Sequence, residues 1–336
     1  MNRSGAVAFV LVSLMAIIVA TTAQQGMAQF TGSVTIKANG TIDPVDAPIE
    51  RVGDSYTLTG DVGGISVQRS NIILDGNGHT LPGIVTSIDS LGNNVTAKNA
   101  GGVYLKNVEN VIVKKLTIKD CQIGIYLEQC SNITVSGNTI TGTYVPVPGM
   151  QSTAGIFVWG GGAHIISGNH IAENMGGIYL GYNAEHNVIV GNNITGNTLG
   201  GMNIWESSNN TIYRNRFINN TIQVRDFAIN SSYWKITSHN MWDNGVVGNF
   251  WSDYNSTDAN NDGVGDIPYL IDENNQDNYP LMEPYTEPEP TPAPQEPEPF
   301  PITLAAVTTG TVAAIAVSAG LIVYFKKHRR QTTPHT

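Results

Sequence analysis

The strongest constraint on the fold is a segment that repeats itself between residues 102 and 223. The repeats read GVYLKNVENVIVKKLTI, GIYLEQCSNITVSGNTI, GIFVWGGGAHIISGNHI, GIYLGYNAEHNVIVGNNI and GMNIWESSNNTIYRNRFI. Their starts lie about 22 residues apart, except where a Pro- and Gly-containing insertion (144–153) lengthens one step. A β-rich repeat of this period is typical of a solenoid, in which each repeat forms one coil. The starts are Gly102, Gly124, Gly155, Gly177 and Gly201.

Alignment of the repeats indicates which side chains face inward. Two apolar columns separated by one residue open each repeat, which is the alternation of a strand with one buried face. Two later apolar columns predict two further short strands in each coil, with Gly and Asn at the turns. Another column is asparagine, and stacked side-chain amides could hydrogen-bond along the roughly 4.8 Å spacing of neighbouring strands. This column comprises Asn138, Asn169, Asn192 and Asn215.

Two segments outside the repeats carry a family resemblance. Residues 55–81 read SYTLTGDVGGISVQRSNIILDGNGHTL, and residues 248–284 include GNFWSDYNSTDANNDGVGDIPYLIDENNQDNYPLMEP. With these segments, the chain resembles the NosD-type right-handed parallel β-helix proteins over roughly residues 53–284. That family is named for a periplasmic copper-binding protein and is related to carbohydrate-binding proteins and sugar hydrolases. Many archaeal surface proteins are similar. The expected fold is therefore all-β, a right-handed parallel β-helix.

The two ends of the chain predict export and a membrane anchor. An apolar run after Arg3, followed by small residues, is typical of a secretory signal peptide, and an uncleaved anchor is the alternative. Residues 302–325 carry no charge and precede a basic segment, as in a single membrane-spanning helix; processing of this anchor is a second possibility. The expected order is signal peptide 1–28, N-terminal cap 29–63, β-helix repeats 64–223, C-terminal cap 224–284, Pro/Glu-rich stalk 285–301, transmembrane helix 302–325 and basic cytoplasmic tail 326–336.

Charge restricts the class of partner. The formal net charge is −10, and only 13% of the residues are charged. An exported domain this acidic repels nucleic acid and favours neutral or basic partners. We therefore expect an extracytoplasmic β-helix domain on the cell membrane that does not bind nucleic acid.

Aromatic residues recur on the outward side of the first strand of the repeats. Flat rings at strand spacing offer surfaces on which sugar rings stack, and exposed aromatic patches mark binding sites. The alternative is a self-stacking ladder that stiffens the coil. The predicted ligand-binding residues are Tyr104, Tyr126, Phe157, Trp159, Tyr179 and Trp205.

No catalytic residue is assigned. The resemblance implies that enzymes of this fold cluster acids on one outer strand column, and glycoside hydrolysis needs two carboxyl groups roughly 5–9.5 Å apart. Here Glu128, Glu173, Glu185 and Glu206 fall at different places in their repeats. The sequence favours a protein that binds carbohydrate or cell-envelope polymer without catalysis. The alternatives are a polysaccharide lyase, epimerase or hydrolase, and a NosD-like maturation or scaffold protein for a membrane complex.

One segment has the spacing of a calcium loop. Residues 258–266, DANNDGVGD, reproduce positions one, three, five, six, seven and nine of an EF-hand loop, although the twelfth position is Tyr269 instead of Glu. A structural Ca²⁺ is predicted, and a simple Asx/Gly turn is the alternative. The predicted ligands are Asp258, Asn260, Asp262, the Val264 carbonyl and Asp266.

The remaining sequence features bear on copper binding and on glycosylation. The histidines are scattered without a His-x-His or Met-rich run, so no copper site is expected. Asn-x-Ser/Thr triplets predict glycosylation, with Asn39 and Asn94 in expected loops as the favoured acceptors.

Overall fold

The computed structural model describes residue 30 and residues 32–88, 94–98, 101–144, 153–227, 229–230, 235–236 and 238–285. The chain divides into residues 1–285 and a second unit, residues 286–336. The predicted signal peptide, transmembrane helix and basic tail lie outside the described residues. Among the described residues, no helix is long and apolar enough to cross a membrane.

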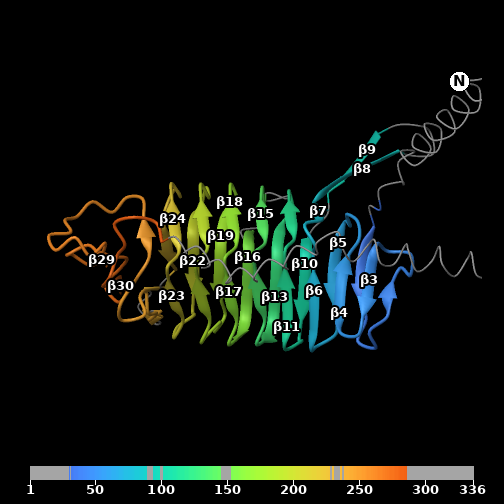
Figure 1. Ribbon diagram of the computed structural model, residues 1–336, viewed down its shortest axis with the longest axis horizontal. Coiled ribbons are helices and arrows are strands. Elements are labelled where there is room, and N and C mark those ends of the chain that lie inside the picture. The colour runs from blue at the N-terminus through green and yellow to red at the C-terminus, as the bar shows by residue number, and fades with distance from the viewer. Residues whose placement is uncertain are drawn as a thin grey trace, which may run out of the picture. The chain divides into compact units, whose positions relative to one another are not determined.

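Three sheets, here called A, B and C, form the walls of the described coils (Figure 1). Sheet A contains, in spatial order, β2 (Ile42–Asp43), β1 (Ser33–Ile36), β5 (Gly64–Val67), β10 (Gly101–Lys106), β13 (Ile123–Ser131), β16 (Ala154–Gly162), β19 (Gly176–Gly181), β22 (Gly200–Trp205) and β25 (Val224–Asp226). Sheet B contains β23 (Thr211–Tyr213), β20 (Val188–Val190), β17 (Ile165–Ser167), β14 (Thr134–Ser136), β11 (Val111–Lys114), β6 (Ile72–Asp75), β4 (Ser55–Leu58) and β3 (Ile49–Val52). Sheet C contains β28 (Phe250–Trp251), β24 (Arg216–Ile218), β21 (Asn193–Thr195), β18 (His170–Ala172), β15 (Thr139–Thr141), β12 (Thr117–Lys119) and β7 (Thr80–Pro82).

Each repeat supplies one strand to each sheet, and neighbouring coils pair in parallel. The register agrees with the aligned sequence columns: Val103 pairs with Ile125, and Ile125 pairs with Ile156. The parallel β-helix predicted from the repeats is therefore confirmed.

The inward columns form the apolar core. Leu105, Leu127, Val158 and Leu180 are all completely buried, and they follow one another along sheet A. Full burial of an aliphatic side chain of this size contributes roughly 1.5–3 kcal/mol. Because every coil adds several such side chains, the fold gains stability coil by coil.

The stack extends beyond the predicted boundaries of 64 and 223. At its start, β1 pairs in parallel with β5, so the coils begin within the expected N-terminal cap. At its end, β25 and β28 continue sheets A and C into the expected C-terminal cap. These strands carry little repeat signature, which is why the aligned columns did not include them.

Three short antiparallel pairs lie outside the sheets. They are β8 (Ile84–Ile88) with β9 (Asn94–Lys98), β26 (Ile229–Asn230) with β27 (Lys235–Ile236), and β29 (Tyr269–Leu270) with β30 (Gln276–Asp277).

Corners between strands explain many of the Asn and Gly residues. At one corner, Asn71, Asn110, Asn132, His186 and Asn209 all adopt the left-handed conformation, with φ between 52° and 61°. Among non-Gly residues, Asn adopts this conformation more readily than most. The turn composition noted in the sequence is thus a backbone requirement.

The predicted asparagine ladder is present and buried. Asn138 Nδ2 donates to Asn169 Oδ1 at 3.0 Å, and Asn169 Nδ2 donates to Asn192 Oδ1 at 2.9 Å. The same contact links Asn192 to Asn215 at 2.9 Å, and Asn215 to Asn249 at 3.0 Å. The side chains therefore satisfy one another inside a wall that excludes water.

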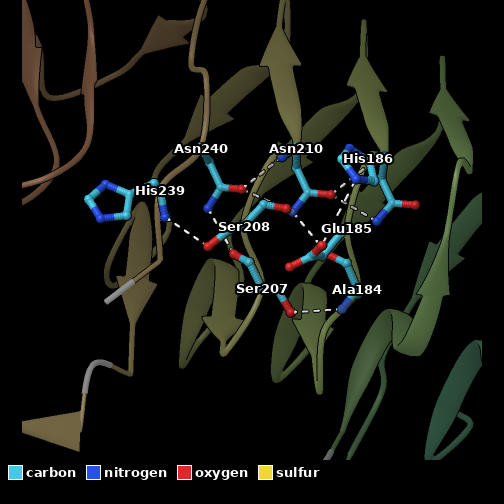
Figure 2. Close-up of polar contacts among 9 residues, drawn as sticks. Ala184, Glu185, His186, Ser207, Ser208, Asn210, His239 and Asn240 are labelled. Carbon is cyan, nitrogen blue, oxygen red and sulfur yellow. Dashed lines mark hydrogen bonds and ion pairs between the residues drawn. The ribbon is translucent and has the colours of Figure 1, made fainter. Parts of the chain in front are cut away.

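Two more ladders occupy other corners, and the sequence did not predict them. In one, Asn210 Nδ2 donates to Asn240 Oδ1 at 2.9 Å (Figure 2). Beside this ladder, Ser207 Oγ accepts from the Ala184 backbone amide at 3.2 Å. In the other, Asn197 Nδ2 donates to Asn220 Oδ1 at 2.8 Å.

All three ladders run in one direction and end on an aspartate. Each side-chain amide directs one N–H toward the C-terminal coils, so the last member needs an acceptor. Asn249 donates its backbone amide to Asp277 at 2.7 Å, and Asn275 Nδ2 donates to Asp272 at 2.9 Å. The third ladder reaches Asp253 through Gln223.

Asp277 also anchors the aromatic C-terminal cap. Its Oδ2 accepts from Trp251 Nε1 at 2.9 Å, and its Oδ1 accepts from the Tyr279 amide at 3.0 Å. Trp251 stacks on Phe217 and Tyr269, with ring centroids 4.5 and 4.3 Å away. The carboxylate is fully buried, so these donors depend on it alone.

We predict that Asp277→Ala lowers the free energy of unfolding by about 2–5 kcal/mol, because several buried donors lose their acceptor. Denaturant titration measures the loss. Substitution of the exposed Asp46 by Ala is the control and should change stability by less than about 0.5 kcal/mol. Equal stability of Asp277→Ala and wild type would contradict the role assigned to this carboxylate.

Asp277→Asn tests the charge separately. Burial raises the pKa of Asp277 from 3.8 to about 6, despite the donors around it. A raised native pKa means that the folded state binds more protons between these values. The Asp277 contribution is therefore present below about pH 4 and is lost as the pH rises through about 6. The difference in unfolding free energy between wild type and Asp277→Asn should shift by about 2–3 kcal/mol across this range. A pH-independent difference would contradict this assignment.

Candidate functional site

The predicted aromatic residues lie together on the outer surface of sheet A. Tyr104 pairs with Tyr126, Tyr126 with Phe157, and Phe157 with Tyr179. The second outward column places Trp159 opposite Gly181, and Gly181 opposite Trp205. We call the following set the aromatic face: Tyr104, Tyr126, Phe157, Trp159, Tyr179, Tyr182, Trp205 and Phe227.

Ring contacts run from β10 to the end of β25. Centroids of Tyr104 and Tyr126 lie 5.3 Å apart, and Tyr126 meets Phe157 edge-on at 5.2 Å. Phe157 stacks on Tyr179 at 4.5 Å. Tyr179 continues to Phe227 at 6.4 Å. The face is therefore one connected aromatic surface across successive coils.

Gly181 allows rings two coils apart to touch. It lies between Trp159 and Trp205 in the second outward column, yet these rings lie only 5.7 Å apart. A Cβ at position 181 would lie 2.7 Å from the Tyr179 ring, so the rings occupy the space of the missing side chain. The next residue, Tyr182, has φ of 60° and stacks on Trp159 at 5.1 Å.

Exposure divides the face into a buried base and an accessible surface. Phe157 is 3% exposed, whereas Tyr182 is 48% and Phe227 40% exposed. Phe157, predicted as a ligand-binding residue, therefore lies beneath its neighbours, because rings pack against it from three directions. Self-stacking and an accessible aromatic surface, which the sequence treated as alternatives, are both present.

Tyr182 and Phe227 were missed by the sequence. Tyr182 lies at a corner, outside the aligned columns, and reaches the face through its left-handed backbone. Phe227 follows β25, beyond the last recognised repeat, in register with Trp205. Extension of the column by one more coil would have found Phe227.

A polar cluster borders the face at β10 and β13. Lys106 Nζ lies 2.6 Å from Glu128 Oε1, and the Tyr104 hydroxyl donates to Glu128 Oε2. The hydrogen bonds from Lys106 and Tyr104 lower the pKa of Glu128. Burial, followed by the bond to Glu128, raises the pKa of Tyr104 to about 12. Glu128 therefore stays ionised and Tyr104 stays protonated at neutral pH.

The predicted calcium loop is folded around its own carboxylates. Asp258 accepts from the amides of Asp262 and Gly263 at 3.1 and 2.9 Å, and Asn260 Nδ2 donates to Asp262 at 2.9 Å. Asp266 instead accepts from Thr257 and the Ala259 amide. Both of these bonds go to Asp266 Oδ2. Within the described part of the chain, no group of three or more His, Cys, Asp or Glu side chains is arranged to hold a metal ion.

The two predicted glycosylation acceptors differ in their surroundings. Asn39 is exposed in a turn, where its Oδ1 accepts from the Thr41 hydroxyl at 2.8 Å. Asn94 was expected in a loop, but it begins β9 and pairs with Ile88. Glycosylation of both remains a prediction.

Comparison with known proteins identifies the family. The family model described as "Periplasmic copper-binding protein (NosD)" matches residues 31–256. The chain belongs to this family. The NosD match places the described domain among extracytoplasmic proteins and covers the coils that form the aromatic face.

Individual relatives are more distant. The chain is 29% identical over 174 residues to the "Probable ABC transporter binding protein NosD" of Stutzerimonas stutzeri, which covers 48% of this chain and 33% of the relative. The protein of the same description from Pseudomonas aeruginosa is 26% identical over 163 residues, 47% of this chain and 31% of that protein. The chain thus spans about a third of these relatives' length.

A crystal structure of a mutant of the periplasmic alginate epimerase AlgG is similar at a TM-score of 0.38 and 17% identity. The similarity covers 70% of this chain and 60% of that one. A double mutant of the same epimerase gives a TM-score of 0.33.

The family description raises the question of copper, and three residues of the types that bind it, His164, Cys121 and Cys130, are buried. His164 is buried, its Nδ1 accepts from the Ile133 amide at 3.1 Å, and burial lowers its pKa to about 4. Cys121 and Cys130 are buried thiols. Burial raises the pKa of Cys121 to about 12, which opposes the thiolate that binds a metal. No copper chemistry is assigned to these residues.

Calcium binding by residues 258–266 stays a prediction with a direct test. Calorimetry should detect Ca²⁺ binding, and Ca²⁺ at a hundredfold excess over its dissociation constant should stabilise the protein by about 2.7 kcal/mol. Asp258→Asn combined with Asp262→Asn should abolish both effects, whereas Asp46→Asn should not. Identical melting with calcium and with chelator would reject the site.

Proposed function

We propose that this NosD-family protein binds carbohydrate or cell-envelope polymer along the aromatic face of sheet A, without catalysis. The observation that carries the proposal is the continuity of the face. Contacting rings extend from β10 to Phe227, and the more exposed ones, Tyr182 and Phe227, lie on the outer side. At about 4.8 Å per strand, successive coils repeat on the scale of sugar units in a chain.

The chemistry suits rings of neutral sugars. Each pyranose has an apolar face that packs on an aromatic ring and an equatorial rim of hydroxyl groups. Glu128 and Tyr104 offer an acceptor and a hydroxyl at one edge of the face. Lys106 is paired with Glu128, so its charge is largely compensated there.

The protonation states of the polar cluster oppose two catalytic roles, a general acid at Glu128 and a base at Tyr104. General acid catalysis needs a carboxyl group with a raised pKa, but the pKa of Glu128 is lowered. A tyrosine base needs a lowered pKa, but that of Tyr104 is raised. A lyase, epimerase or hydrolase remains the alternative; release of new products from a polysaccharide panel would establish it.

We also propose that the β-helix acts outside the cytoplasmic membrane. With a cleaved signal peptide and residues 302–325 in the membrane, the Pro/Glu-rich segment would hold the β-helix outside the cell. A surface protein placed there meets cell-envelope polymers directly. A structural Ca²⁺ and glycans at Asn39 and Asn94 are compatible with this location and are part of the same proposal.

Glycan-array binding of the full-length protein tests the face. Tyr182→Ala, Trp205→Ala and Phe227→Ala are combined, because these rings are accessible and lie outside the buried core. Loss of one to three stacking contacts should weaken binding by at least about tenfold.

Tyr213→Ala provides a matched control. Tyr213 points outward from β23 in sheet B, away from the aromatic face. This variant should bind as wild type does, and melting curves should show that both variants are folded. Equal binding by the triple variant and wild type would reject the aromatic face as the site.

A further inference from the structure

The last strand of sheet A breaks the pattern of its inward columns. In five successive strands, the second inward position is aliphatic: Val67, Leu105, Leu127, Val158 and Leu180 are all at most 1% exposed. Ile204 continues the column in β22. In β25, the paired position is Asp226, although Val224 keeps the first position apolar.

Asp226 is only partly compensated among the described residues. Ser238 Oγ donates to Asp226 Oδ1 at 3.3 Å, and the Ser238 backbone amide and nearby His239 also favour the charged carboxylate. Burial, with the charge of nearby Asp272 as a further cause, raises the pKa of Asp226 to about 6. A cation beside the Asp226 carboxylate would offset both the cost of its burial and its repulsion by Asp272.

β25 has an unpaired edge. It ends the order of sheet A, and no other described strand pairs with its outer side. Toward β22, the Met202 amide donates to the Gln223 carbonyl, and the Phe227 amide donates to the Ile204 carbonyl. In a parallel ladder, the alternate residues Val224 and Asp226 therefore direct their amides and carbonyls to the open side.

A groove follows this edge. One cavity of about 290 Å³ is lined by Val224, Asp226, Asp272 and Glu273, among others. A second of about 320 Å³ continues along residues 220–224, opposite residues 269–271. Both include Ile222, Val224 and Ile271, so they form one groove beside β25.

We propose that this groove receives an extended peptide from a basic partner protein, which adds a strand to sheet A. The partner strand places an apolar side chain over Val224 and a Lys or Arg over Asp226. These side chains are two residues apart because alternate residues of a strand share a face.

The charge of the groove favours a basic partner peptide over a second copy of this chain. Asp226, Asp272 and Glu273 line the groove together with Arg225, and His239 lies near Asp226. The whole chain carries a formal charge of −10, so another copy is repelled while a basic partner is attracted.

Peptide titration of the full-length protein, followed by fluorescence anisotropy at physiological salt, tests the proposal. The probe is fluorescein-labelled Thr-Val-Thr-Lys-Thr-Val, compared with versions that carry Glu or Leu in place of Lys. Wild type should bind the Lys peptide at least about tenfold more tightly than the Glu peptide.

Substitution of Asp226 should change which peptide binds more tightly. Asp226→Leu restores the aliphatic residue of earlier coils and should favour the Leu peptide over the Lys peptide. Asp46→Asn, outside the groove, should leave the preference for Lys unchanged. Equal binding of the Lys and Glu peptides by wild type would overturn the proposal.

Val224→Pro tests the strand edge itself. Proline removes the amide that faces the open side, while the bonds to β22 come from residues 223, 225 and 227. Binding of the Lys peptide should fall at least about tenfold. Unchanged binding by folded Val224→Pro, or a dimer of wild type that Val224→Pro dissolves, would contradict a partner strand at this edge.

Discussion

The structure depends on how its buried corner amides are satisfied. A coil must turn three times, and each turn removes backbone groups from the sheet ladders. Asparagine solves this problem because one side chain both donates and accepts. Asn169 accepts from the Asn138 amide through Oδ1 and donates through Nδ2 to Asn192 and to the Val135 carbonyl. Without such pairing, the apolar core could not close around its corners.

Because the hydrogen bonds of each ladder run in one direction, its two ends need different partners. The N-terminal members accept from backbone amides, such as Leu116 N to Asn138. The C-terminal members need acceptors, and Asp277, Asp272 and Asp253 supply them. The C-terminal cap is therefore specified by the chemistry of the corners as well as by the exposed apolar end of the core.

The sequence predicted what repeats and missed what occurs once. Inward columns and the Asn138–Asn215 ladder recur at fixed spacing, so alignment reveals them directly. His164 begins a second ladder, where its Nδ1 accepts from Ile133, and a single histidine among asparagines carries no periodic signal. Two of the acids that end the ladders lie far from their partners in sequence: Asp277 is 28 residues from Asn249, and Asp253 is 30 residues from Gln223.

The same distinction applies to the candidate site. Period-two alternation identified the outward columns, but it could not show that Phe157 is covered by its neighbours. Burial there depends on side-chain direction across three coils. Tyr182 enters through a left-handed corner, a conformation that residue identity does not predict for tyrosine.

The missing side chain at Gly181 has a consequence for recognition. Because Trp159 and Trp205 meet across it, the two rings already pack against one another without a ligand. Ordering of free aromatic side chains normally opposes binding. A surface whose rings are already packed loses little side-chain entropy when a ligand binds. The preorganisation of this surface therefore depends on Gly181.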